Sequence, residues 1–245
     1  NILSKIVSHG EISNSDIILE IGPGTGLLTQ KILDKSPNEL IVVEKDKELS
    51  INLKKKFGNK IQIINKDILK CYSEFNLGVP IKVFGNLPYN ISTQILTSFV
   101  KVENLEKNFL KFLFVFQKEV AERIVAEQNS KNYGRLSIFT SWKMNSSKIF
   151  DISPKNFYPI PKVWSTFLKL TPKSDYEKIK KSKNLEHITN IFFNQRRKMI
   201  KKPMKQIFKN YEAISNKLNL DLNLRPQNLS KKQYLILCKI YETLI

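Results

Sequence analysis

The amino-acid sequence predicts an α/β fold, in which helices cover both faces of a sheet, followed by a small C-terminal all-α domain. The first observation is an alternation of short apolar runs with helical segments up to about residue 170. Strands that alternate with helices form βαβ units, which build a parallel sheet between two helical layers. The second observation is the loss of any strand pattern after Thr171-Pro172. We therefore expect one domain over residues 1–172 and a second, helical domain over residues 173–245.

The individual elements follow from apolar periodicity and from turn residues. Buried strands are expected at residues 16–21, 39–44, 61–64, 81–85 and 109–116, and further strands at 136–142 and 165–170. Helices are expected at residues 2–9, 25–34, 47–57 and 118–127, with short helices over 184–245, one of them at 233–244. Residues 154–161 contain three prolines and are expected to form a loop.

Length and composition exclude several classes of protein. The chain has 245 residues, 41% of them hydrophobic, and only two cysteines, so it is neither a disordered chain nor a disulfide-stabilised miniprotein. It has no run of about 18 apolar residues, which excludes a membrane-spanning segment. The first residues lack the apolar run of a signal peptide. We expect a soluble protein of the reducing cytoplasm that has no membrane partner.

The formal net charge of +19 is unevenly distributed. Residues 171–245 hold 17 basic and 6 acidic residues, a net charge of +11, whereas residues 1–170 carry a net charge of +8. Such an excess indicates a polyanionic partner, most commonly nucleic acid. The alternative is a lysine-rich composition that comes from an AT-rich genome, but such a bias would spread the charge evenly. The asymmetry favours a C-terminal domain that contacts phosphate.

A glycine-rich segment, Glu20-Ile21-Gly22-Pro23-Gly24-Thr25-Gly26, follows the first buried strand and opens a helix. Glycines at this place let the backbone turn and approach a ligand closely. The spacing differs from the G-x-G-x-x-G pattern that binds a pyrophosphate, and the acidic Glu20 would repel phosphate. The pattern suits a ligand with a cationic amino-acid end, such as S-adenosylmethionine.

Two further acids follow the next two predicted strands. Glu44, with Lys45 after it, lies roughly 20 residues past the glycines, where a carboxylate can accept hydrogen bonds from ribose hydroxyls. Asp67 could accept from an adenine amine, with Ile68 against the ring. Each acid alone is equally well explained as a solvated loop residue. Three acids at three successive strand ends favour a ligand site, because ligands of open α/β sheets bind at those ends.

The segment Asn86-Leu87-Pro88-Tyr89 follows the fourth predicted strand and suggests methylation of an exocyclic amine. The Asn86 amide oxygen and the Leu87 carbonyl can accept the two N–H groups of such an amine and stabilise the charge that develops on it. Pro88 makes the turn rigid, and Tyr89 offers a ring on which an extruded base can stack. The alternative is an ordinary turn at the end of a strand.

Five motifs, in this order along the chain, together resemble one family. They are Glu20–Thr29 (EIGPGTGLLT), Phe84–Thr93 (FGNLPYNIST), Gln117–Arg123 (QKEVAER) with Tyr133–Ser137 (YGRLS), Phe157–Ser165 (FYPIPKVWS) and Phe192–Lys198 (FFNQRRK). The sequence resembles the small-subunit rRNA adenine N6,N6-dimethyltransferase (KsgA-type) family, a branch of the Rossmann-like S-adenosylmethionine methyltransferases.

The resemblance implies a role for each candidate residue. Glu20, Gly22, Gly24, Glu44, Lys45, Asp67, Ile68 and Asn86 would bind S-adenosylmethionine, and Asn86, Leu87, Pro88, Tyr89 and Phe157 would present the target adenine. The reaction would be dimethylation of two adjacent adenines near the 3′ end of small-subunit rRNA, in an immature small ribosomal subunit. We expect a monomer. The RNA would contact Arg135, Arg196, Arg197, Lys198, Lys201 and Lys202, although a solvated charged face is the alternative for that run.

Two departures from the family pattern stand out. The family usually carries a Gln-Asn-Phe-Leu segment just before the first residue of this sequence, and we expect its absence to affect activity. Pro203 follows the basic run, so the helix predicted there is expected to end or kink. His9, His187, Cys71 and Cys238 lack metal-ligand spacing, and we expect no metal site.

Three other functions are compatible with the sequence. One is a related enzyme class that modifies large-subunit rRNA and confers antibiotic resistance, and another is a DNA adenine methyltransferase. The third is a binding protein, because relatives of the family serve as mitochondrial transcription factors. The intact Asn86–Tyr89 segment argues against a purely binding role.

Overall fold

The computed structural model describes residues 2–244, which form two compact units. The first unit contains the described residues up to Ala121 together with Met144–Ser174, and the second contains Glu122–Lys143 and the described residues from Asp175 onward. The sequence-based division after residue 172 differs from this grouping in two places: the sequence assigns residues 122–143 to the first domain and residues 173–174 to the second.

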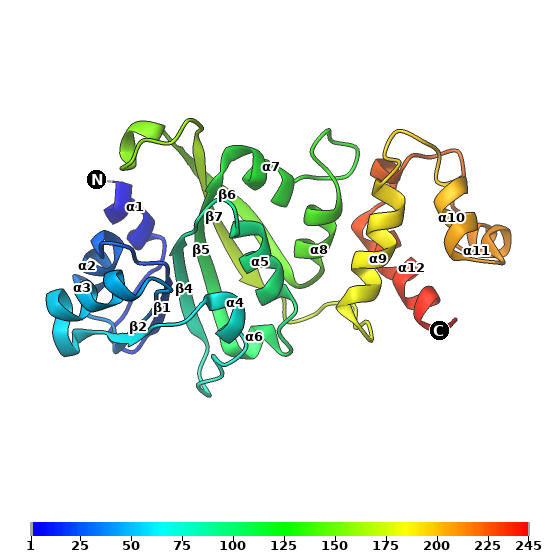
Figure 1. The fold of residues 1–245 in the computed structure, drawn as a ribbon. Helices are drawn as coiled ribbons and strands as arrows, with labels where there is room; N and C mark the ends of the chain where they lie inside the picture. The colour runs from blue at the N-terminus through cyan, green and yellow to red at the C-terminus, as the bar shows by residue number, and fades with distance from the viewer. Residues whose placement is uncertain (1, 245) are drawn as a thin grey trace. The chain divides into compact units, whose positions relative to one another are not determined.

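The first unit is built on a seven-stranded sheet with the order β3-β2-β1-β4-β5-β7-β6 (Figure 1). The strands are β1 (Ile17–Ile21), β2 (Glu39–Val43), β3 (Gln62–Ile64), β4 (Ile81–Asn86), β5 (Phe109–Gln117), β6 (Met144–Ile152) and β7 (Ser165–Pro172). The strands β1 to β5 pair in parallel, as predicted. The expectation of a parallel sheet holds for these five strands but not for the whole sheet, because β7 runs antiparallel to both β5 and β6. The sheet is therefore mixed.

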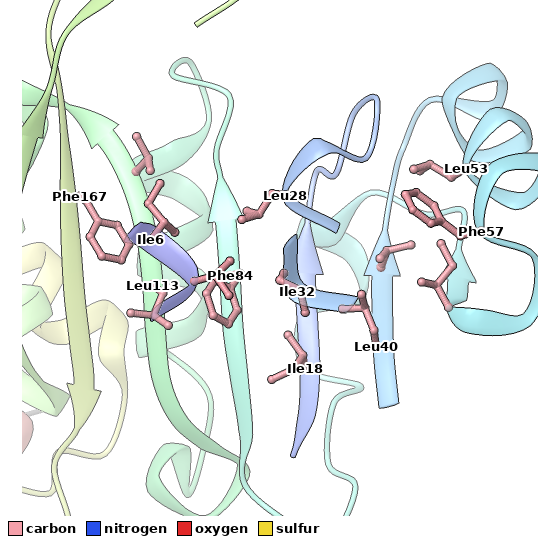
Figure 2. Close-up of a cluster of buried hydrophobic side chains, with 14 of the residues drawn as sticks. Ile6, Ile18, Leu28, Ile32, Leu40, Leu53, Phe57, Phe84, Leu113 and Phe167 are labelled. Carbon is pink, nitrogen blue, oxygen red and sulfur yellow. The ribbon is translucent and has the colours of Figure 1, made fainter. Parts of the chain in front are cut away.

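One face of the sheet is covered by α1 (Ile2–Ser8), α2 (Leu27–Leu33) and α3 (Lys47–Phe57), which supply buried side chains to a continuous core. Figure 2 shows Ile6, Leu28, Ile32, Leu53 and Phe57 from these helices in one cluster with Ile18, Leu40, Phe84, Leu113 and Phe167 of the strands. The helix α3 begins where predicted because the Asp46 side chain accepts a hydrogen bond from the Leu49 amide, at 2.9 Å.

The other face of the sheet packs against α5 (Ser92–Val100), with the short helices α4 (Ile68–Cys71) and α6 (Leu105–Asn108) nearby in sequence. The Phe99 ring of α5 lies 5.0 Å from Phe112 and 5.3 Å from Phe109, between ring centroids. Both faces of the central strands are thus buried, which is why these strands are almost uniformly apolar. The two helical layers hold the strand ends, and the groups that follow them, in fixed positions.

Two elements differ from the sequence prediction. Residues 136–142 are helical, within α8 (Arg135–Lys143), where the sequence predicts a strand. Most of this helix is buried around its circumference, so its sequence lacks the polar face that marks a surface helix. The strand β6 was not predicted, because it is an edge strand with four partly buried and three exposed positions among mostly polar residues.

The second unit is helical. Its elements are α8, α9 (Ser182–Phe193), α10 (Lys201–Ile207), α11 (Tyr211–Lys217), α12 (Lys231–Glu242) and a 3₁₀ turn at Pro226–Asn228. The short helix α7 (Lys118–Ile124) crosses the boundary between the units. The first unit also contains 3₁₀ turns at Gly58–Lys60 and Pro154–Asn156. The Tyr234 ring packs edge-on against Phe192 at 5.4 Å, and the Tyr133 hydroxyl donates to the Leu229 carbonyl at 2.9 Å.

Pro203 lies in the first turn of α10 and is buried. The prediction that a basic helix breaks at Pro203 is wrong, because residues 194–200 form turns and the new helix begins only at Lys201. A proline is tolerated in a first turn, where the backbone N–H groups have no partner within the helix.

No helix among residues 2–244 is both long and apolar enough to cross a membrane.

Candidate active site

The candidate site lies at the carboxyl ends of four neighbouring strands. The order β3-β2-β1-β4 and the parallel pairing place these ends along one edge of the sheet. Asp67 follows β3, Glu44 follows β2, the glycine-rich segment follows β1, and Asn86 ends β4. The chain leaves β1 and β4 in opposite directions across the sheet, and such a switch point is where open α/β sheets bind ligands.

The glycine-rich segment leaves open space beside its backbone. Gly22 and Gly24 have φ angles of +65° and +57°, and a Cβ atom at either position would have no neighbouring atom within 4 Å. These glycines therefore adopt a conformation that disfavours other residues, and a ligand can approach them closely. Gly26 has a different role, because a Cβ atom there would lie 2.5 Å from the Phe57 ring. It allows α2 to pack against α3.

Glu20, the last residue but one of β1, is buried with 1% of its surface exposed. Its Oε2 atom has no hydrogen-bond partner among the described residues. Burial, with a smaller contribution from the charge of Glu44, raises the pKa of Glu20 to about 8, and the nearby Thr29 opposes that shift. A buried carboxyl group of this kind gains most from a cationic partner.

Glu44 is held rigidly beside the glycine-rich segment. Its Oε2 atom accepts a hydrogen bond from the Gly24 amide at 3.2 Å, and its Oε1 atom accepts one from the Asp46 amide at 2.9 Å. The Asn65 amide donates to the Glu44 carbonyl at 2.8 Å and to the Ser50 hydroxyl at 3.0 Å, which fixes the turn after β2. Each carboxylate oxygen retains a lone pair that can accept a ligand hydroxyl.

Asp67 caps the short helix α4, because its Oδ1 atom accepts a hydrogen bond from the Leu69 amide at 3.0 Å. Its Oδ2 atom lies 3.0 Å from the Lys45 ammonium group, which is largely exposed. The hydrogen bond from Lys45 lowers the pKa of Asp67, so this carboxylate is ionised at neutral pH. Ile68, the next residue, is buried. The predicted pair of Glu44 and Asp67 is thus brought to adjacent strand ends.

The segment that follows β4 lines a small pocket together with the loop before β7. The pocket has a volume of about 230 Å³ and is lined by Asn86, Leu87, Pro88, Tyr89, Phe157, Tyr158, Pro159 and Pro161. The five predicted catalytic residues therefore meet in one place, although Phe157 lies far from the others in sequence. The Asn86 side chain is exposed and makes no hydrogen bond within the described part of the chain, so its amide is available to a substrate.

The two walls of this pocket are connected by a hydrogen bond between the Tyr89 and Ser165 hydroxyls, at 2.6 Å. Ser165 is fully buried at the start of β7. The Tyr89 carbonyl also accepts from the Ser92 hydroxyl at 3.1 Å. The functions of Ser165 and Asn65 could not be predicted from the sequence, because their hydrogen-bond partners are distant along the chain.

A basic groove of about 920 Å³ lies in the second unit. Its cationic side chains are Arg197, Lys198, Lys201, Lys202, Lys205 and Arg225, and no acidic residue lines it. None of these six forms an ion pair within residues 2–244. Four of them were predicted from the sequence. Lys205 was not predicted to bind RNA, although it lies four residues after Lys201 and therefore on the same side of α10. No pattern in the sequence indicated Arg225.

Two of the predicted RNA-binding residues lie elsewhere. Arg135 is the exposed first residue of α8 and does not line the groove. Arg196 is half-buried, and its guanidinium donates to the Gln227 side chain at 3.2 Å and to the carbonyls of Ser130, at 3.2 Å, and Lys131. Arg196 therefore joins three segments of the second unit. Its charge is largely engaged within the protein.

A family model described as "Ribosomal RNA adenine dimethylase" matches residues 1–243. The chain belongs to the ribosomal RNA adenine dimethylase family. Among its relatives, a "Ribosomal RNA small subunit methyltransferase A" of Pelagibacter ubique is 53% identical over 245 residues, which cover 99% of this chain and 92% of the relative. A protein of the same name from Ehrlichia ruminantium is 43% identical, over 96% of this chain and 89% of the relative.

Solved structures agree with this family assignment. A dimethyladenosine transferase from Plasmodium falciparum superposes with a TM-score of 0.76 at 25% identity, covering 99% of this chain and 95% of that one. The 23S rRNA methyltransferase ErmE superposes with a TM-score of 0.72 at 20% identity, covering 99% and 96%, which shows the fold alone. These matches confirm the family and the Rossmann-like methyltransferase fold that the motifs predict. They also confirm the predicted enzyme class, an S-adenosylmethionine-dependent rRNA adenine dimethyltransferase.

The residues at the strand ends fit the cofactor of this family. The space beside Gly22 and Gly24, the two Glu44 oxygens and the unpartnered Glu20 oxygen offer room, hydroxyl acceptors and a site for a cation, respectively. Within the described chain, no three His, Cys, Asp or Glu side chains gather as metal ligands.

Proposed function

We propose that this enzyme dimethylates the N6 atoms of two adjacent adenines near the 3′ end of small-subunit rRNA, using S-adenosylmethionine. The substrate is rRNA in an immature small ribosomal subunit, and the enzyme acts in the cytoplasm as a monomer. The observation that carries this proposal is the pocket shared by Asn86–Tyr89 and Phe157, which adjoins the strand ends where the cofactor residues lie. The names of the relatives support the small subunit as the substrate.

The cofactor residues divide by the part of S-adenosylmethionine that they recognise. Glu44 accepts hydrogen bonds from the two ribose hydroxyls, and its contact with the Gly24 amide fixes the carboxylate for that task. Asp67 accepts from the adenine amine, and Ile68 packs against the adenine ring. Glu20, Gly22 and Gly24 surround the methionine part, whose ammonium group compensates the buried carboxylate of Glu20. Lys45 neutralises Asp67 until the cofactor binds.

The target adenine enters the pocket between Tyr89 and Phe157, and these rings hold it by stacking. The exocyclic nitrogen is a poor nucleophile, because its lone pair is delocalised into the purine ring. The Asn86 side-chain oxygen and the Leu87 carbonyl accept its two N–H groups. This favours a tetrahedral nitrogen and stabilises the positive charge that develops as the N–C bond forms.

The bound cofactor supplies an electrophilic methyl group on a sulfonium. The adenine nitrogen that Asn86 and Leu87 orient would accept this methyl group, and the cofactor would be left as a neutral thioether. The methylated nitrogen then loses a proton to water, so no residue of this chain is needed as a general base. The second methyl transfer requires another cofactor molecule. The monomethylated nitrogen has one remaining N–H group, which the Asn86 side-chain oxygen or the Leu87 carbonyl accepts.

The basic groove of the second unit docks the rRNA. Arg197, Lys198, Lys201 and Lys202 contact phosphates, and Lys205 and Arg225 line the same groove. Arg135 is an additional, separate contact. Binding at such a groove releases counterions from the RNA, so affinity falls steeply as salt rises. The stronger positive charge of the C-terminal part of the chain supports a role of the second unit in binding RNA.

The proposal is tested with labelled S-adenosylmethionine and three substrates: undermethylated small subunits, large-subunit rRNA and DNA. Label is expected in two adjacent adenines near the 3′ end of the small-subunit rRNA and in neither other substrate. Label in the large-subunit rRNA or in DNA alone would reject the proposal. Sedimentation of the enzyme during turnover checks the monomer.

A further inference from the structure

The loop before β7 exposes an unusual concentration of large apolar side chains. Tyr158 is 100% exposed, Ile160 66%, Trp164 50% and Val163 44%. An isolated exposed apolar residue is ordinary, but several in one short loop indicate contact with another molecule. Tyrosine and tryptophan are enriched at interfaces, because each combines a large apolar ring with a polar group.

The loop is well positioned, because it adjoins the pocket for the target base. Tyr158 lines that pocket together with Phe157, Asn86 and Tyr89, although its own side chain is entirely exposed. Tyr158 therefore lies at the pocket mouth rather than inside it. The end of the loop is anchored, since the Lys118 amide donates to the Trp164 carbonyl at 2.9 Å and the Ser165 hydroxyl bonds to Tyr89.

The charges of the loop indicate the kind of partner. Residues 152–165 contain no acidic side chain, and Lys155 and Lys162 are exposed. Neither lysine forms an ion pair among residues 2–244. The Lys118 ammonium group lies 6.0 Å from the Trp164 ring centroid. Aromatic rings interspersed with lysines are the pattern of surfaces that stack single-stranded bases and attract their phosphates.

We propose that Tyr158 stacks the base of the nucleotide next to the target adenine. When the target base is extruded into the pocket, its neighbour loses a stacking partner, and a ring at the pocket mouth can replace that partner. Tyr158 is then a positioning residue that holds the RNA strand in register with Asn86. This inference rests on the proposed function, because it requires an extruded base in the pocket.

The test uses the full chain and a short single-stranded RNA that contains two adjacent adenines. Each adenine is replaced in turn by 2-aminopurine, whose fluorescence is quenched when it stacks. We expect Tyr158→Ala to weaken RNA binding about tenfold and to abolish the quenching of the neighbouring base. Tyr158→Phe keeps both properties, whereas Tyr158→Leu, which is apolar but not aromatic, behaves like the alanine variant.

An RNA that lacks only the neighbouring base provides the decisive control. The wild-type enzyme is expected to bind this RNA about tenfold more weakly than the complete RNA. Tyr158→Ala should not weaken binding to it further, because the missing base and the substitution each remove the same stacking interaction. Methyl transfer to small subunits by Tyr158→Ala should show a raised KM and a nearly unchanged kcat. Equal binding by wild type and Tyr158→Ala would overturn the proposal.

Other outcomes are equally decisive. A wild-type enzyme that fails to methylate small subunits rejects the proposed function, whereas an active wild type with an unaffected Tyr158→Ala rejects only the stacking role. If Tyr158→Leu behaves like wild type, an apolar contact replaces stacking and the proposal is wrong. Binding to anionic lipid vesicles that Ile160→Ala abolishes, with unchanged RNA binding by Tyr158→Ala, would assign the loop to a membrane surface instead.

Discussion

The Tyr89 hydroxyl lies 2.6 Å from the Ser165 hydroxyl, and this hydrogen bond joins the segment after β4 to the first residue of β7. Ser165 is fully buried, so it is a fixed point to which the Tyr89 ring is attached. The bond sets the position of one wall of the pocket for the target base. The loop that carries Phe157, the other wall, ends at the same serine.

Breaking this bond is expected to lower kcat without unfolding the protein. Tyr89→Phe and Ser165→Ala each remove one neutral hydrogen bond, which contributes about 0.5–1.5 kcal/mol, so each should lower kcat roughly two- to tenfold. The double variant should be no slower than the slower single variant, because both changes remove the same bond. Steady-state kinetics on small subunits measure this. Additive losses would show that the two hydroxyls act independently.

Asn86→Ala is expected to reduce methyl transfer by a factor of about 100 or more, because it removes one of two acceptors that stabilise charge on the reacting nitrogen. Cofactor binding should remain measurable by calorimetry, since Glu44 and the glycine-rich segment remain intact. The matched control is Asn76→Ala, which alters an exposed asparagine in the loop before β4. Equal turnover by Asn86→Ala and the control would reject the amine-orienting role of Asn86.

Glu20 should make the stability of the cofactor-free enzyme depend on pH. Burial raises its pKa from 4.5 to about 8, so the folded state favours the protonated carboxyl. The unfolded chain loses this proton near pH 4.5, whereas the folded chain retains it until about pH 8. The free energy of unfolding therefore falls as pH rises between these values, by up to about 1.4 kcal/mol for each pH unit.

Glu20→Gln isolates that effect, because glutamine has the same shape and no proton to lose in this range. Relative to this variant, the wild type should be progressively less stable in urea as pH rises from 5 to 8. S-adenosylmethionine should reverse the trend, since its ammonium group favours the ionised carboxylate and its binding would release a proton from Glu20. Parallel stability curves for the two proteins, with no proton release on binding, would contradict this role.

The sequence predicted the groups at the strand ends well, for local reasons. Glu20, Glu44, Asp67 and Asn86 each follow a strongly apolar run, and parallel pairing alone brings the ends of such runs together. The burial of Glu20 is a tertiary property that local sequence does not reveal. Asn65 and Ser165 were missed because their function depends on partners 21 and 76 residues away.

The errors in the predicted fold have a common origin. Residues 136–142 resemble a strand because a helix buried all round lacks a polar face. The antiparallel direction of β7 was missed because β7 pairs with β6, a strand that was itself not predicted. The polar residues of β6 lack the apolar pattern of a buried strand. In both cases, contacts between distant segments decide the structure, and periodicity within one segment does not report them.

Arg196 and Arg197 are adjacent in sequence but are expected to differ in function. Arg196 donates to Gln227, Ser130 and Lys131, whereas Arg197 is exposed in the basic groove. Arg196→Ala should therefore lower the free energy of unfolding by about 2 kcal/mol, because it removes hydrogen bonds from a charged donor. Arg197→Ala should leave stability within about 0.5 kcal/mol of the wild type.

For RNA binding the expected order is reversed: Arg197→Ala should have the larger effect and Arg196→Ala the smaller one. Loss of one phosphate contact in Arg197→Ala is expected to reduce the slope of log K against log salt by about 0.7–0.9. Arg196→Ala, measured below its unfolding transition, should keep the wild-type slope, because its guanidinium is engaged within the protein. Urea unfolding and filter binding to small-subunit rRNA at several salt concentrations measure both quantities. A reduced slope in Arg196→Ala with unchanged stability would instead place Arg196 on the RNA.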